Sequence, residues 1–388
     1  MSAHMRKVNS LVLTALAFLT VSCSAPRQQM DELHPGEPIR GYMAHRGVHL
    51  SSTLCGENSL EAISFAKRAG FFCIETDCRY TKDSVLVIIH DAYLNRTFLN
   101  ADHSPIADTV KVADLTLEQF QTQYVLKADR KEYQTAAPTL RQYLEECREI
   151  GFRVFIEPKL NDPSGRFYED IIRTADDVLG RQGYVITSNN FANQVIRNTL
   201  CLDDVRLMGL LFKSSFEQMD SLCNMIYAVS STAFSHQQYY ENLNRAVSDG
   251  RVVQSAEVLR SHSSQRRFET FMRLRQAPKI NYIATDYAAP DYHGQGSVLL
   301  HASDMKTLKN WLKTAEKVEF GGIYIDMKYS GDCQITCSSD TFKAKGDSSI
   351  LNTLSYQRMF FDEKPNVAVV ADSPDFAIKS IDVKIIKF

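Results

Sequence analysis

Residues 72–77 read Phe-Cys-Ile-Glu-Thr-Asp, a short apolar run that ends in two carboxylates. Similar apolar runs recur along the chain, and segments with helical spacing separate them. Eight short runs that alternate with helices predict an α/β fold, the (β/α)8 barrel, in which helices surround a closed parallel sheet. Besides Phe72–Glu75, the predicted strands are Gly41–Ala44, Val154–Ile156, Tyr184–Thr187, Leu207–Leu211, Tyr227–Val229, Arg251–Val253 and Tyr282–Ala284.

Two of the separating segments have the pattern of amphipathic helices. In Ser59–Ala69 and in Thr139–Ile150, apolar residues recur on one helical face. Leu86–Ile89 adds a strand after the second run, and Asp91–Tyr133 forms a long polar connection with one helical pattern in it. Long loops on a barrel often carry function, so we expect this connection to lie near the site.

After Pro290 the pattern changes from alternating strands and helices to mostly strands. We expect the barrel to span residues 39–295. We expect a small β-rich domain, with the strand pattern of a β-sandwich and of unassigned role, to span residues 296–388. Its last run alternates in part, as the last strand of a sandwich does. The predicted elements are a helix at Lys306–Ala315 and strands at Val318–Lys328, Cys333–Ser338, Ala368–Ala371 and Ile378–Lys387.

The N-terminus has the pattern of an export signal. Two basic residues precede the apolar run Leu11–Leu19, and small residues lead to Cys23. Residues 1–23 therefore predict a signal peptide with a lipobox-like end, and residues 24–38 a polar linker. We expect a lipoprotein of the cell envelope, periplasmic or at the surface, with a membrane anchor on Cys23. A plain signal peptide cut elsewhere is the alternative.

Charge and cysteine content narrow the function further. The 388 residues include 44 basic and 46 acidic ones, mixed along the chain, with a net charge of -2. This balance argues against nucleic acid as a partner. The spacing of the cysteines after Cys23 does not suggest a dense disulfide framework, and Cys333 with Cys337 is the only plausible close pair. Cys73 and Cys147 have apolar neighbours and are expected to be buried thiols.

Charged side chains follow several predicted strands. In a parallel barrel, the side chains at the carboxyl ends of the strands converge on one cavity. We therefore expect these residues to form one site. They are His45 and Arg46 after the first strand, Glu75 and Asp77 at the second, His90 after the added strand, Glu157 and Lys159 after the third, and Asp286 after the eighth.

Three of these residues predict a metal site. Glu75 and Asp77 are two positions apart, so on a strand both carboxylates point to the same side, and Glu157 would join them from the next strand. Three carboxylates suit a hard divalent cation, Ca²⁺ or Mg²⁺, rather than zinc. Without a cation they would repel each other, and at least one would take up a proton.

The remaining residues suit displacement at phosphorus. His45 and His90 can supply a base for the attacking hydroxyl and an acid for the leaving oxygen, in an order that the sequence leaves open. Arg46 and Lys159 can neutralise the phosphate. The expected substrate is a small-molecule phosphodiester.

Several segments together resemble the glycerophosphodiester phosphodiesterase family over roughly residues 40–290. The resemblance implies a TIM barrel that hydrolyses glycerophosphodiesters to sn-glycerol 3-phosphate and an alcohol. It places acid/base catalysis on His45 and His90, the metal on Glu75, Asp77 and Glu157, and phosphate contacts on Arg46 and Lys159. The segments are Ala44–Gly47, Gly56–Ser59, Ile74–Asp77, Thr81–Ser84, His90–Asp91, Leu94–Thr97, Pro138–Leu140, Ile156–Lys159 and Ala284–Tyr287.

Two departures from the family pattern limit how far the resemblance carries over, and the second bears on the choice of substrate more than on the chemistry. Pro158 stands where the family has an apolar residue, which would alter the aim of Lys159, and Gln254–Glu257 replaces the family's Trp-Thr-Val-Asn. One alternative is a phospholipase C/D-like enzyme that releases a cyclic phosphate. Another is a non-catalytic surface-binding lipoprotein. A glycan or another envelope component is the partner class expected for the C-terminal domain.

Overall fold

The computed structural model describes residues 41–210, 222–223, 225–227, 241, 244–246, 248–258, 263–276 and 280–388. The predicted signal peptide, Cys23 and the linker lie outside these residues, as do Leu211 and the last two residues of the run Tyr227–Val229. Among the helices that are described, none has the length and apolar character needed to cross a bilayer.

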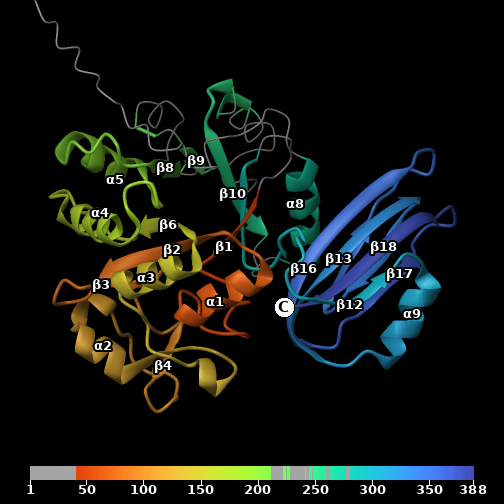
Figure 1. Cartoon of the computed structure of the whole chain (residues 1–388), viewed down its shortest axis with the longest axis horizontal. Coiled ribbons are helices and arrows are strands. Elements are labelled where there is room, and N and C mark those ends of the chain that lie inside the picture. Colours follow the sequence, from red (N-terminus) through yellow and green to blue (C-terminus); the bar gives the residue numbers. More distant parts are fainter. Residues whose placement is uncertain are drawn as a thin grey trace, which may run out of the picture. The chain divides into compact units, whose positions relative to one another are not determined.

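Eight parallel strands close into a barrel, as the sequence predicts. Strands β1 and β2, whose pairing closes it, lie side by side in Figure 1. The eight strands pair in the order β1-β11-β10-β9-β8-β7-β6-β2, and the pairing of β1 with β2 closes the ring. Strand β3 (Leu86–Ile88) adds to β2 in the antiparallel direction. The barrel strands are β1 Gly41–His45, β2 Cys73–Tyr80, β6 Arg153–Pro158, β7 Tyr184–Ser188, β8 Leu207–Leu210, β9 Met225–Tyr227, β10 Val252–Val258 and β11 Tyr282–Thr285.

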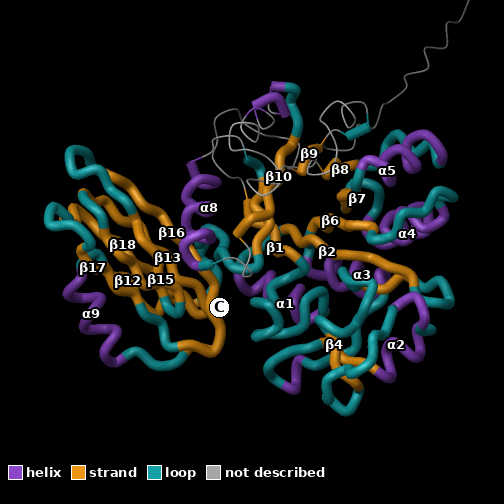
Figure 2. The backbone as a smooth tube through the Cα atoms, turned by 180° about the vertical axis from the view of Figure 1, so that it is seen from behind, coloured by secondary structure: helices purple, strands orange, loops and turns teal. Residues whose placement is uncertain are grey.

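Amphipathic helices cover the outside of these strands, and α3 and α4 lie on the outer side in Figure 2. Ser59 caps the first helix by accepting from the backbone of Ala62, and Thr139 caps α3 through a capping box with Gln142. These caps explain why the predicted helix starts are correct. The helices are α1 Leu60–Ala69, α3 Leu140–Ile150, α4 Arg166–Leu179, α5 Asn190–Gln194 with the π-helix Val195–Thr199, and α8 Ser264–Gln276.

The long connection after β3 has more structure than the single predicted helix. It contains α2 (Leu117–Gln123) and a pair of antiparallel strands, β4 (Phe98–Asn100) and β5 (Tyr124–Leu126), besides short 3-10 turns at Val112–Asp114 and Lys131–Tyr133. Its apolar side chains form a small core of their own with those of β3. Strands of three residues are too short to show a period, which is why the sequence did not reveal them.

The C-terminal region folds into two antiparallel sheets, as predicted. One has the strand order β12-β18-β13-β16 and the other β15-β14-β17. The last strand of the chain, β18, lies between β12 and β13, inside its sheet. Strands β12, β15 and β16 were not predicted. The elements are β12 Ser297–Ala302, α9 Met305–Thr314, β13 Val318–Ser330, β14 Cys333–Cys337, β15 Asp340–Ala344, β16 Asn352–Glu363, β17 Val367–Ala371 and β18 Ala377–Lys387.

The cysteine pair that the sequence singled out does not form a disulfide. Cys333 and Cys337 are both free, at the two ends of β14. Four residues of extended strand span about 13 Å, whereas a disulfide needs Cα atoms less than about 7 Å apart. Cys73 and Cys147 are buried free thiols, as expected.

Candidate active site

A tight turn follows β1 and carries the first site residues. Arg46 and Gly47 both have positive φ angles, 55° and 77°. A Cβ at position 47 would lie 2.5 Å from the Cβ of Ala62, so only glycine fits there. The turn directs the backbone N–H of Arg46 at Oε2 of Glu75, to which it donates at 3.1 Å. The His-Arg-Gly sequence thus forms the turn by which the chain leaves β1, next to the carboxylate of Glu75.

Three carboxylates meet at the carboxyl ends of two neighbouring strands. Asp77 of β2 pairs in register with Glu157 of β6. Glu75 lies two residues before Asp77 on β2, so both side chains point to the same face of the sheet. One oxygen of each carboxylate lies within 4.8 Å of one oxygen of each of the others. Glu75 and Asp77 are buried, and Glu157 is half-buried. The predicted cluster therefore forms.

The electrostatics of this cluster fit a bound cation. Burial, with the neighbouring Asp77 and Glu157, raises the pKa of Glu75 well above its usual value. Burial and Asp77 also raise the pKa of Glu157 against the opposing effect of Lys159. Three carboxylates that cannot all ionise by themselves are the donor set of a hard divalent cation. We therefore take Glu75, Asp77 and Glu157 as residues that could hold Ca²⁺ or Mg²⁺.

Two cationic side chains form ion pairs with the carboxylates of this cluster. Lys159 Nζ is 3.1 Å from Asp77 Oδ1 and 2.5 Å from Glu157 Oε1, and Arg46 Nε is 3.2 Å from Asp77 Oδ2. Although burial opposes it, these two cations lower the pKa of Asp77. Pro158 does not turn Lys159 away, since the ammonium group points into the site. Both cations therefore balance part of the negative charge of the carboxylate cluster.

His45 is held by a carboxylate from the opposite end of the barrel sequence. Its Nδ1 lies 2.6 Å from Oδ1 of Asp286, which follows β11, and its Nε2 lies 3.9 Å from Oε2 of Glu75. The imidazoles of His45 and His49 lower the pKa of Asp286 against the effect of burial. With Nδ1 bonded to this carboxylate, Nε2 of His45 is the nitrogen that faces the site.

His90 is held in the same way. Its Nδ1 lies 2.5 Å from Oδ1 of Asp91, and Arg96 Nε donates to the other oxygen of Asp91 at 2.5 Å. Against the effect of burial, Arg96 and His90 lower the pKa of Asp91 to about 2. Burial, together with Arg46 and Lys159, lowers the pKa of His90. His90 therefore tends to the neutral form, which can accept a proton.

A buried carboxylate links this second histidine to the turn after β1. Glu57 accepts two hydrogen bonds from Arg96, at 2.9 and 2.7 Å, and one from Arg46 at 3.2 Å. The next residue, Asn58, donates to Asp77 Oδ2 at 3.1 Å and accepts from Thr76 at 2.9 Å. The Gly-Glu-Asn-Ser segment thus helps to orient the candidate catalytic residues, but it contributes none of these residues itself.

Sequence reasoning assigned no role to the residues that orient the two histidines. Asp91 and Asp286 stand in motifs that it singled out, but no sequence pattern says which carboxylate bonds to which imidazole. Arg79 was missed altogether. It donates to the backbone oxygen of His90 at 2.9 Å and to that of Lys159 at 2.7 Å, and so ties the two loops together.

Two further polar residues face the barrel interior. Glu75 pairs with Phe155 and Phe155 with Val185, so Thr187, two residues along β7, lies on the inner face. Gln254 lies in register with Tyr282, whose ring is 5.9 Å from that of Phe155. Thr187 Oγ1 and Gln254 Oε1 are buried, with no hydrogen-bond partner among the residues described. Both are candidate substrate contacts.

The sequence matches known proteins over the barrel. Residues 45–271 match the Glycerophosphoryl diester phosphodiesterase family. Glycerophosphodiester phosphodiesterase 1 of Bos taurus is 30% identical over 138 residues, which are 34% of this chain and 38% of that protein. The human protein of the same name is 29% identical over 166 residues, 39% of this chain and 45% of that protein. The chain thus spans less than half the length of these curated relatives.

Solved structures of the same kind share the fold. A glycerophosphodiester phosphodiesterase from Parabacteroides distasonis superposes with a TM-score of 0.50 at 18% identity, covering 65% of this chain and 94% of that one. One from Silicibacter pomeroyi, described as putative, gives 0.51 at 16% identity, covering 67% and 93%. The family match covers more than half of the chain and lies on the barrel that carries the site. The chain belongs to the glycerophosphoryl diester phosphodiesterase family.

Proposed function

We propose that this protein hydrolyses a glycerophosphodiester to sn-glycerol 3-phosphate and an alcohol, in a metal-dependent reaction with His45 and His90 as acid and base. One observation carries the proposal. Each imidazole is held through Nδ1 by an aspartate, at 2.6 Å for His45 and 2.5 Å for His90, which leaves Nε2 of both rings for proton transfer. Family membership supports the same reaction class.

The chain's own groups account for the proton transfers. In an in-line displacement, water or a hydroxyl attacks phosphorus and loses its proton to one imidazole, while the leaving alkoxide oxygen takes a proton from the other. Arg46 and Lys159 balance the charge of the phosphate oxygens. A divalent cation bound by Glu75, Asp77 and Glu157 would supply Lewis-acid polarisation of the phosphoryl group.

Product analysis tests the proposal. Purified protein is incubated with a panel of glycerophosphodiesters that differ in their alcohol, with Ca²⁺ or Mg²⁺ or with chelator, and the products are identified by ³¹P NMR. We expect a phosphate monoester that forms only with metal. A stable cyclic phosphate as the end product would favour the phospholipase C/D-like alternative.

Two variants test whether the histidines are required for the reaction. His45→Ala and His90→Ala should each abolish turnover while the protein stays folded. If the wild type and both variants cleave nothing under any metal condition, the protein is better described as a binding lipoprotein.

We also propose export to the cell envelope with a lipid anchor on Cys23, supported by the signal-like residues 1–23. Metabolic labelling with radioactive palmitate should mark the wild type and leave Cys23→Ser unlabelled. Equal recovery of both proteins in the soluble exported fraction would contradict the anchor. A glycan or another envelope component stays the proposed partner class of residues 296–388, and binding to isolated envelope polysaccharide tests it.

A further inference from the structure

The chain that follows β11 is held from two sides. Thr285 Oγ1 accepts from the backbone N–H groups of Tyr287 at 2.9 Å and of Ala288 at 2.8 Å. From the C-terminal region, the backbone N–H of Met359 in β16 donates to the backbone oxygen of Tyr287 at 2.8 Å. Asp286, the residue that holds His45, lies between these bonds. Its position therefore depends on the C-terminal strands as well as on the barrel.

The side chain of Tyr287 ends in a buried ionic cluster. Its hydroxyl donates to Oδ2 of Asp340, in β15, which is 3% exposed. Asp340 also accepts from Ser264 at 2.9 Å and pairs with Arg267 at 2.5 Å and Arg358 at 3.5 Å. The two guanidinium carbons lie 4.4 and 4.6 Å from the centroid of the Tyr287 ring. Because buried ion pairs tolerate little displacement, the cluster holds Tyr287 in one place.

The strand that carries His45 is held by the same C-terminal strand. Tyr42 lies in β1, three residues before His45, and its hydroxyl donates to Gln357 Oε1 of β16 at 3.0 Å. Gln357 in turn donates to Asp291 at 2.6 Å. Strand β16 thus contacts both β1 and the segment after β11, the two parts of the barrel that supply the His45–Asp286 pair.

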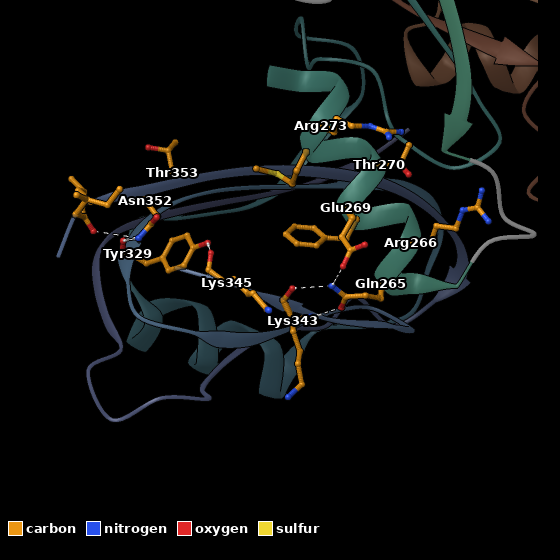
Figure 3. A pocket seen from close by; sticks show the side chains of 14 residues that line it. Gln265, Arg266, Glu269, Thr270, Arg273, Tyr329, Lys343, Lys345, Asn352 and Thr353 are labelled. Atoms are coloured by element: carbon orange, nitrogen blue, oxygen red, sulfur yellow. Dashed lines mark hydrogen bonds between the residues drawn. The ribbon is translucent and has the colours of Figure 1, made fainter. Parts of the chain in front are cut away.

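Helix α8 strengthens this attachment along the groove seen in Figure 3. The side chain of Gln265 bonds to both backbone groups of Lys343 in β15: its Oε1 accepts at 2.8 Å and its Nε2 donates at 3.2 Å. An amide side chain that pairs with a strand in this way acts as one more residue of the sheet. The barrel and the C-terminal sheets are therefore joined by directional bonds as well as by apolar contact.

We propose that Tyr287 and Asp340 are positioning residues for the His45–Asp286 pair, and hence that the C-terminal domain is part of the catalytic unit. The inference rests on the proposed function. Asp286 lies past the last residue of β11, so the strand ladder does not fix it. A displacement of about 1 Å would stretch the 2.6 Å contact with His45 beyond hydrogen-bonding distance.

A double-mutant cycle on kcat tests the inference. Tyr287→Phe keeps the ring and removes the hydroxyl, and it should lower kcat about tenfold with KM nearly unchanged. In an Asp286→Asn background the same substitution should change kcat no further, because the two residues act through one contact. Independent losses that multiply in the double variant would overturn the proposal. The control is Lys343→Ala, which changes an exposed side chain of β15, the strand that also carries Asp340. This variant should keep the kcat of the wild type.

A second measurement needs no activity. In protein labelled with ¹⁵N-histidine, the Nδ1–H signal of His45 is identified by its loss in His45→Gln. Tyr287→Phe and Asp340→Asn should shift or broaden this signal, while Lys343→Ala leaves it in place. An unchanged signal in the folded Tyr287→Phe variant would overturn the inference. If the wild type cleaves no phosphodiester, the proposed function fails and this measurement still decides the inference.

Discussion

Nδ1 of His45 lies 2.6 Å from Oδ1 of Asp286, although 241 positions separate the two residues in the chain. The contact exists because β1 and β11 are neighbours in the closed barrel, with Ala44 in register with Thr285. Each residue stands one position beyond this last pair. Barrel closure therefore brings an imidazole and the carboxylate that orients it together at one edge.

Asp286→Asn should disable His45 while leaving the protein folded. An amide is neutral and can donate as well as accept, so it no longer selects the tautomer with a proton on Nδ1. We expect kcat to fall on the order of 100-fold or more, the contribution typical of acid–base catalysis, with little change in KM. Steady-state kinetics and circular dichroism check this. A wild-type kcat in the variant would show that Asp286 does not act on His45.

Glu75→Gln should remove metal binding and turnover together. It replaces one of three buried carboxylates with a neutral amide, so we expect affinity for Ca²⁺ or Mg²⁺ to drop by more than about 100-fold, beyond the loss usual for outer-shell partners. Isothermal titration calorimetry measures the affinity. Glu61→Gln, on α1, is the matched control and should bind metal like the wild type. Equal affinity in wild type and Glu75→Gln would rule out this metal site.

Arg96→Ala should lower turnover although it leaves the side chains of His45 and His90 themselves unchanged. Arg96 bonds both Glu57 and Asp91, and a hydrogen bond to a charged group contributes about 1.5–3 kcal/mol. We expect kcat to fall roughly tenfold, since Asp91 then holds His90 less firmly. Arg96→Lys keeps the charge but not the paired geometry and should recover part of the rate. Identical rates in all three proteins would remove Arg96 from the network.

Thr187→Val tests the polar residue on the inner face of β7. The two side chains are nearly isosteric, so the substitution removes only the buried hydroxyl. If this hydroxyl contacts substrate, KM should rise by about 2- to 12-fold, which corresponds to one neutral hydrogen bond of about 0.5–1.5 kcal/mol. Thermal unfolding should show no loss of stability, because the hydroxyl has no partner among the described residues. A lower melting temperature with unchanged KM would assign Thr187 a structural role.

Gly47→Ala should destabilise the turn that follows β1. The added Cβ would meet Ala62 at 2.5 Å in a backbone with φ of 77°, so we expect a loss of about 2 kcal/mol or more in the free energy of unfolding. Gly151→Ala, at a helix end with φ of 83° and nothing within 4 Å, carries the conformational cost alone. Urea denaturation of both variants separates the clash from the strain. Equal losses would show that Ala62 moves away freely.

The sequence by itself determined the barrel and the residues at its strand ends. Short apolar runs that alternate with capped amphipathic helices are local patterns, and such patterns survive without knowledge of the fold. The spacing of Glu75 and Asp77 likewise determined that both carboxylates share one face. The C-terminal sheets were foreseen only in part. In β16, buried Gln357 and Arg358 interrupt the alternation that marks a strand, because they bond across to other segments.

Only the tertiary structure decided which groups orient the histidines. Asp91 is the neighbour of His90 in the chain, but Asp286 reaches His45 solely because the barrel closes. The attachment of Tyr287 to Asp340 depends in the same way on where the C-terminal sheets lie against α8 and the segment after β11. Contacts between residues far apart in the chain are set by packing and barrel closure, and no local pattern records them. The sequence therefore contained the candidate catalytic groups, whereas the fold determined which carboxylate holds each histidine in place.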